Sequence, residues 1–138
     1  MTGAAAHGLR LRRSSDDVVV CRHLVVGESF WQRFRGLMGK ASLPEGEGLY
    51  LPDSSIHMMF MRFAIDALFM ADPGVDGGRR VVGMREHLPP WRGLVMPVRG
   101  AQGVVELPAG TLSRYQVSIG DTFVFENADE VKTVVSAA

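Results

Sequence analysis

The sequence lacks most of the features that would place it in a special class of protein. It holds a single cysteine, Cys21, so an intrachain disulfide is impossible. Its 15 basic and 15 acidic residues cancel, which argues against a general nucleic-acid or anionic-membrane binder. No run approaches the ~18 apolar residues of a membrane span, and the N-terminal region lacks the apolar stretch of a signal peptide. We therefore expect a cytoplasmic protein without membrane insertion.

Sequence motifs of common enzymes and metal sites are also missing. The chain contains no G-x-S-x-G, P-loop, H-E-x-x-H or C-x-x-C motif. Its four histidines have no metal-ligand spacing. On a strand, His57, Met59 and Met61 would share one face and could suit Cu(I), but methionine commonly fills irregular cores and this chain has eight. We predict no metal and no cofactor.

Short strand patterns separated by turn residues dominate what is present. The length of 138 residues fits one domain. We expect a flexible tail at 1–8, a single β-rich domain at 9–126, and a C-terminal strand or tail at 127–138. The fold class is mainly β (α+β), a sandwich- or barrel-like sheet of about seven or eight short strands with one or two short helices. The predicted strands are 9–13 (as a charged edge strand), 18–26, 49–51, 55–60, 64–70, 80–87, 102–107 and 121–126; the predicted helices are 29–38 and 110–116.

The segment S-I-H-M-M-F-M-R-F-A-I-D-A-L-F at 55–69 is the most informative, because three polar side chains interrupt an apolar run. A single strand of this length would be unusual, so we expect two strands that meet at a corner near 61–63. The bend could bring His57, Arg62 and Asp66 together. Arg62 and Asp66 are most simply an internal ion pair, and a pair that binds a ligand carboxylate or sugar hydroxyl is the alternative.

Five motifs together resemble a known family, domain of unknown function 192. They are R-F-R-G-L-M-G-K (33–40), the 55–69 segment, L-P-P-W-R (88–92), V-V-E-L-P-A-G (104–110) and I-G-D (119–121). His57, Met61, Arg62, Ile65 and Asp66 match the family's central pattern, whereas Ala64 stands where that pattern has proline. The resemblance implies a mainly β domain with a sandwich-like core, widespread in prokaryotes, and brings no established activity.

Two classes of function remain open. The first is a non-catalytic ligand-binding or accessory module, with a site built from His57, Arg62, Asp66 and Glu106 and with Trp91 near its rim. The second is a hydrolytic enzyme that uses Asp66 or Glu106 as acid or base and His57 as partner. We prefer the first, because no nucleophile or metal set accompanies the carboxylates. The expected partner is a small molecule of unknown identity, with no nucleic acid, and the chain is expected to be a monomer or weak homodimer.

Overall fold

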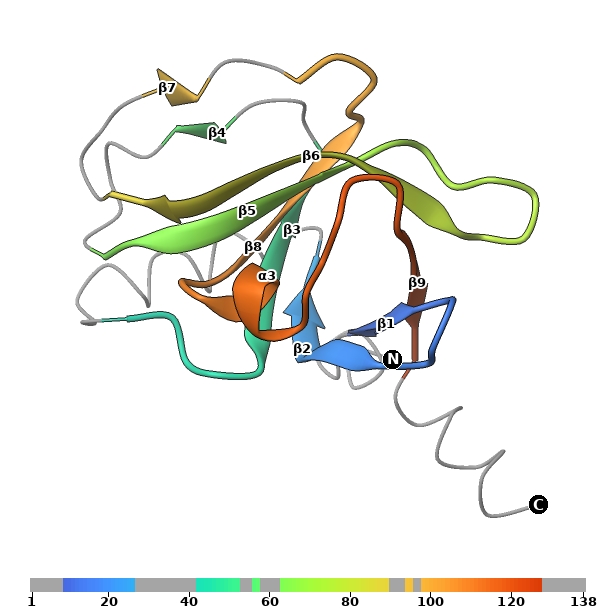
Figure 1. The fold of residues 1–138 in the computed structure, drawn as a ribbon, viewed down its shortest axis with the longest axis horizontal. Helices are drawn as coiled ribbons and strands as arrows, with labels where there is room; N and C mark the ends of the chain where they lie inside the picture. Colours follow the sequence, from blue (N-terminus) through green and yellow to red (C-terminus); the bar gives the residue numbers. More distant parts are fainter. Residues whose placement is uncertain are drawn as a thin grey trace, which may run out of the picture.

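A computed structural model describes residues 9–26, 42–52, 56–57, 63–89, 94–95 and 98–127. Seven strands of this described part form a closed barrel in the order β1-β2-β3-β8-β5-β6-β9, and β4 and β7 form a separate two-stranded sheet (Figure 1). The bounds are β1 Leu9–Arg13, β2 Val19–Val25, β3 Glu47–Leu51, β4 Ile56–His57, β5 Ile65–Met70, β6 Arg79–Leu88, β7 Leu94–Val95, β8 Gly103–Pro108, α3 Thr111–Arg114 and β9 Thr122–Glu126. The mainly β fold is confirmed, and it closes as a barrel. The helix predicted at 29–38 lies outside the described residues.

The N-terminal hairpin forms as predicted, but its first strand is not an edge. β1 pairs with β2 on one side and with β9 on the other, both antiparallel, so the expectation of a solvated edge strand at 9–13 is wrong. The error has a physical cause, because β9 closes the barrel with residues 110 to 116 positions further along the chain, as from Arg13 to Phe123 and from Arg10 to Glu126. The remaining barrel pairings are antiparallel except for β2 with β3, which is parallel.

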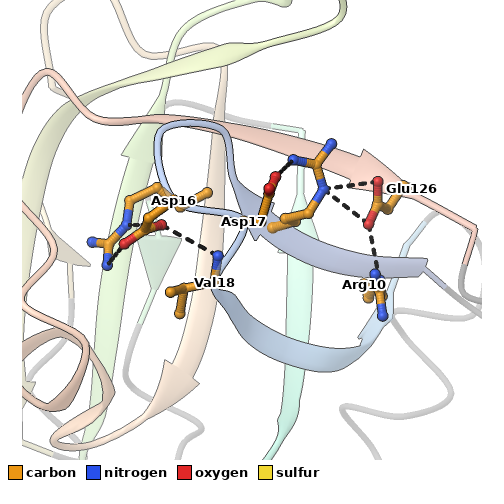
Figure 2. Close-up of polar contacts among 7 residues, drawn as sticks. Arg10, Asp16, Asp17, Val18 and Glu126 are labelled. Carbon is orange, nitrogen blue, oxygen red and sulfur yellow. Dashed lines mark hydrogen bonds and ion pairs between the residues drawn. The ribbon is translucent and has the colours of Figure 1, made fainter. Parts of the chain in front are cut away.

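The basic residues of β1 serve this closure. Glu126 on β9 accepts hydrogen bonds from Arg10 at 2.9 Å and from Arg12 at 3.1 Å, and Figure 2 shows Arg10 and Glu126 facing each other across the two strands. Arg13 is buried and pairs with Asp16 at 3.0 Å and with Asp121 at 3.3 Å. The alternation of basic residues along β1 therefore holds neighbouring strands together rather than protecting a free edge.

Two apolar clusters lie on the two faces of the barrel wall. The inner cluster draws on all seven barrel strands and includes Leu11, Leu68, Val105 and Phe123. The buried members of the outer cluster come from β3, β5, β8 and flanking loops, and partly buried residues of β2 and β6 pack against them. The buried members are Leu43, Leu49, Phe63, Ile65, Ala67, Phe69, Ala101 and Val104. Every residue of β5 is buried as a result, which explains why its sequence, apart from Asp66, is apolar without alternation.

The long apolar segment divides as predicted. β4 and β5 are separate strands in different sheets, so a continuous strand from 55 to 70 does not form. β4 pairs with β7, with His57 opposite Leu94, whereas β5 lies in the barrel wall between β6 and β8. Of the predicted corner, only Phe63 is within the described residues, and it is buried in the outer cluster.

Candidate functional site

Asp66 lies on the inner face of β5 and is fully buried. Its Oδ1 accepts the backbone N–H of His87 at 2.9 Å, and its Oδ2 accepts those of Gly110 at 3.1 Å and Leu112 at 2.9 Å. A buried carboxylate is expensive unless it is hydrogen-bonded, and bonds from backbone N–H groups to an ionised acceptor are among the stronger ones. These three bonds account for a charge in this position. Arg62 lies outside the described residues, so the predicted ion pair remains a prediction.

The three N–H groups come from places where the backbone is irregular. The β5–β6 register shifts by one residue between Ile65 and Ala67, which leaves a bulge on β6 where His87 has φ 52°. Gly110 has φ 96°, a left-handed conformation that glycine adopts without a steric penalty. Leu112, in α3, inserts into the inner cluster. Asp66 thus fastens the β8–α3 turn and the end of β6 to one end of the barrel.

Glu106 lies on the neighbouring strand β8 but on the other face. In the β5–β8 register Asp66 is opposite Leu107, whereas Glu106 is opposite Ala67, a member of the outer cluster. Glu106 is 5% exposed, and among the described residues its Oε1 has no hydrogen-bond partner. Burial raises its pKa to about 7. The two carboxylates that sequence reasoning grouped together therefore do not face each other across a cleft.

The side chains of the other three predicted site residues lie outside the described part of the chain. The backbone of His57 lies in β4, but its side chain is outside what the structure describes, as are Arg62 and Trp91 in full. Of the five predicted residues the structure describes the side chains of Asp66 and Glu106 alone, and it places these two on opposite faces of the barrel wall.

A cleft that sequence reasoning missed lies beside Gly110. Its volume is about 470 Å³, and three segments of the chain line it. The lining residues are Ser42, Leu43 and Glu45 in the first segment, Phe63 and Ala64 in the second, and Pro108, Ala109, Gly110, Thr111 and Arg114 in the third. Two of these segments belong to motifs that carried the family resemblance, since Phe63 and Ala64 lie in the 55–69 segment and Pro108 ends β8 within E-L-P-A-G. Ile65 lies opposite Pro108 in the barrel wall, so the two motifs meet beside the cleft. A sequence signal that the two motifs pair would therefore have located the cleft.

The cleft combines apolar walls with a charged rim. Leu43, Phe63 and Pro108 supply apolar surface, and an ion pair between Glu45 and Arg114 lies at the exposed edge. The hydrogen bond from Arg114 lowers the pKa of Glu45. The side chains of this pair are 70% and 61% exposed, so the interaction is weakly held and can be exchanged. The Thr111 hydroxyl donates to the carbonyl oxygen of Pro108 at 2.7 Å, which steadies the turn below.

The described part of the chain holds neither a metal-ligand cluster nor a helix that could span a membrane. Within residues 9–26, 42–52, 56–57, 63–89, 94–95 and 98–127, no three His, Cys, Asp or Glu side chains gather closely enough to hold a metal ion. In the same ranges no helix has the length and hydropathy needed to cross a membrane.

The fold and cleft define a small closed β-barrel domain with a hollow at one end, next to a turn fastened by a buried aspartate. The chain belongs to the family of domain of unknown function 192, described as "Uncharacterized ACR, COG1430", which matches residues 12–125. It is 33% identical over 116 residues to a UPF0127 protein of Thermococcus sibiricus, covering 80% of this chain and 71% of the relative. A UPF0127 protein of Pyrococcus furiosus is 35% identical over 100 residues, covering 68% and 78%. The resemblance recognised in the sequence is thereby confirmed.

Two solved structures share the fold. A Sinorhizobium meliloti protein, provisionally described as a transcription regulator, has a TM-score of 0.59 and 25% identity, covering 85% of this chain and 92% of that one. A protein of unknown function from Novosphingobium aromaticivorans also has a TM-score of 0.59, with 23% identity and coverage of 83% and 81%. The second likeness concerns the fold alone.

Proposed function

We propose that this domain is a non-catalytic module that binds a small molecule in the cleft beside Gly110. The observation that carries the proposal is the cleft itself. Its volume of about 470 Å³ lies within the roughly 300–1,000 Å³ typical of small-molecule sites. Such sites are mostly apolar with a few placed polar groups, and here Leu43 and Phe63 contrast with Glu45 and Arg114.

Asp66 acts in this proposal as a positioning residue. It does not line the cleft, but it holds the N–H of Gly110, which does. A wall fixed in advance reduces the ordering that a ligand would otherwise have to impose, which favours binding. Arg62 is proposed to contribute a polar group to the same site, because it directly precedes Phe63 in the chain. His57 and Trp91 stay proposed members of the site on the sequence pattern alone.

Glu106 has a different place. Pro108 lines the cleft, and Glu106 precedes it by two residues on β8, so both belong to the outer face of the barrel wall. A carboxyl group whose pKa is about 7 could serve as a general acid or base, which is the one observation favouring the hydrolytic alternative. Asp66 cannot assist it, because Asp66 belongs to the inner face and its two oxygens hold three backbone N–H groups.

A fragment screen followed by two-dimensional ¹H–¹⁵N NMR tests the binding module. Ligands should shift the amide signals of Phe63, Ala64 and Ala109 first. The Ala109→Trp variant fills the cleft and should abolish these shifts, whereas Val75→Trp, at a fully exposed turn position, should leave them intact. Hits that shift other surfaces, or that bind Ala109→Trp unchanged, would contradict the proposal.

Chemical stability of the bound ligand tests the non-catalytic part. Each hit should be recovered unchanged after incubation with the protein, as measured by mass spectrometry. Turnover that disappears in Glu106→Gln would instead support the hydrolytic alternative.

A further inference from the structure

The charges around the cleft indicate which class of molecule it takes. A second, smaller hollow of about 20 Å³ adjoins the cleft, and Glu45, Thr111 and Arg114 line both. Arg22 lines only the smaller hollow. Of the described residues around the two hollows, Arg22, Arg114 and Glu45 carry full charges at neutral pH, and their sum is +1. The described charged side chains that line the two hollows therefore favour an anionic ligand over a cationic one.

We propose that the ligand is a small monocarboxylate with an apolar body, that Arg114 binds its carboxylate, and that Arg22 receives the displaced Glu45. This inference rests on the proposed function, since it names the ligand class of the same cleft. The exchange is local. Glu45 already interacts electrostatically with both arginines, because Arg114 and Arg22 each lower its pKa, Arg114 the more strongly.

The exchange leaves no charge unpaired. Before binding, Arg114 is paired with Glu45. After binding, Arg114 holds the ligand carboxylate, and Glu45 faces Arg22 across the smaller hollow that all three residues line. A neutral ligand would gain less from Arg114 than a carboxylate would, and a cationic ligand would meet two arginines and one glutamate. Guanidinium groups bind planar carboxylates through two parallel hydrogen bonds, so this anchor also fixes orientation.

The walls select the remainder of the molecule. Beyond Arg114 the cleft is bounded by Leu43, Phe63, Pro108 and Ala109, which offer apolar contact and few hydrogen-bonding groups. The hydroxyl proton of Thr111 is already donated to the Pro108 carbonyl, so it is not available to a ligand. A carboxylate that carries an aliphatic or phenyl group fits this distribution better than a sugar, which would leave many hydroxyl groups without partners.

Matched probes test the inference by calorimetry and NMR. Phenylacetate should bind at least about tenfold more tightly than its neutral amide, phenylacetamide, and than phenethylamine, because only the acid pairs with Arg114. Phenyl phosphate separates a carboxylate site from a general anion site, and it should bind more weakly than phenylacetate because removing its larger charge from water costs more. An amide or phosphate that binds as tightly as the acid would overturn the inference.

Variants of the arginines and of the glutamate should change the affinity for phenylacetate in opposite directions. Arg114→Gln should lower the affinity for phenylacetate about tenfold and leave the affinity for phenylacetamide unchanged. Arg22→Gln should lower the affinity for phenylacetate by a smaller factor of about two to five. Glu45→Gln should raise the affinity for phenylacetate roughly a few-fold, because this change removes the carboxylate that competes for Arg114. The control is Arg85→Gln, since Arg85 is an exposed arginine on β6 that bonds only the carbonyl of Met84 among the described residues. Its affinity should stay within about twofold of the starting protein.

The outcomes distinguish the inference from the proposed function. If Glu45→Gln weakens phenylacetate, or Arg114→Gln leaves it unchanged, the carboxylate exchange is wrong while binding in the cleft can still hold. If the amide shifts the cleft signals and the acid does not, the same conclusion follows. If neither these probes nor any fragment shifts the signals of Phe63 and Ala109, the proposed function itself fails.

Discussion

Asp66 and Glu106 are two buried carboxylates on adjacent strands, and the fold treats them in opposite ways. Asp66 faces the inner cluster and holds three backbone N–H groups, whereas Glu106 faces the outer cluster with an oxygen that has no partner among the described residues. The register of β5 and β8 separates them, because Asp66 is opposite Leu107 and Glu106 is opposite Ala67. One residue's difference in register decides which face a side chain occupies.

The difference separates a carboxylate that binds backbone N–H groups from one that is buried with an oxygen lacking a partner among the described residues. The bonds to Asp66 make its charge part of the barrel, and no ligand is needed to justify it. Among the described residues Glu106 Oε1 has no hydrogen-bond partner, and burial raises the pKa of Glu106 to about 7. A buried polar residue in a sequence therefore marks a position under constraint without stating whether the constraint is architecture or function.

The largest effect is expected for removal of the structural carboxylate. Asp66→Ala leaves three backbone N–H groups without an acceptor, and each such group costs about 1–3 kcal/mol when it stays buried. We expect a loss of about 3–5 kcal/mol in the free energy of unfolding, measured by urea denaturation. Asp76 is the control, because its side chain accepts a single N–H, that of Gly78, in an exposed turn. Asp76→Ala should lower stability by less than about 1 kcal/mol.

A loss of similar size in both variants would mean that the Asp66 bonds do not hold the end of the barrel. The same measurement on Arg62→Met, alone and combined with Asp66→Asn, tests the ion pair expected from the sequence. Recovery of stability in the double mutant would show that the pair exists, whereas additive losses would leave Asp66 to the backbone alone.

The next effect concerns the sign of a pH dependence. The pKa of Glu106 rises from 4.5 to about 7 in the folded protein. Between these values the folded state binds a proton that the unfolded state has lost, so the contribution to stability is fully present below 4.5 and is lost as the pH rises through 7. A gap of about 2.5 pH units corresponds to at most about 3–4 kcal/mol.

Glu106→Gln removes this titration while preserving shape. We expect the variant to be more stable than the starting protein at pH 8 by about 1–3 kcal/mol, and the advantage to shrink toward pH 5. Urea unfolding of both proteins at the two pH values measures it. An advantage that is the same at both pH values, or a variant that is less stable at pH 8, would show that the Glu106 carboxylate has a partner after all.

A smaller effect is expected where the backbone meets Asp66. Gly110 and Gly77 both have positive φ, 96° and 86°, and a Cβ added at either would contact nothing within 4 Å. Replacement by alanine therefore costs about 1 kcal/mol of backbone strain at each site. Gly110 also donates to Asp66, so we expect Gly110→Ala to be the more destabilising, with the excess vanishing in an Asp66→Asn background. Equal losses in every background would contradict a coupling between the turn and the carboxylate.

Sequence patterns predicted the fold better than the site. Strand runs at 18–26 and 80–87 closely matched β2 and β6, because β-branched residues between turn residues are a local signal. Closure of the barrel could not be predicted, since the β1–β9 pairing is a contact between the two ends of the domain. The placement of Asp66 and Glu106 on opposite faces could not be predicted for the same reason, because the relative register of β5 and β8 is not a local property.

The smallest effect tests a third buried titratable group, on the inner face. Cys21 is 1% exposed, and burial raises its pKa to about 12, which is the same cause that acts on Glu106 but moves the group away from neutral pH. The thiolate is the reactive form, so native Cys21 should resist Ellman's reagent at pH 8 and be labelled only as fast as the protein unfolds. Dithiothreitol should change the melting temperature by less than about 1 °C, because no disulfide stabilises the chain. The Gly46 carbonyl oxygen lies 3.5 Å from the Cys21 sulfur. Rapid stoichiometric labelling of the folded protein would show that β2 opens beside Gly46. The inner face would then be less closed around Cys21 than it is around Asp66.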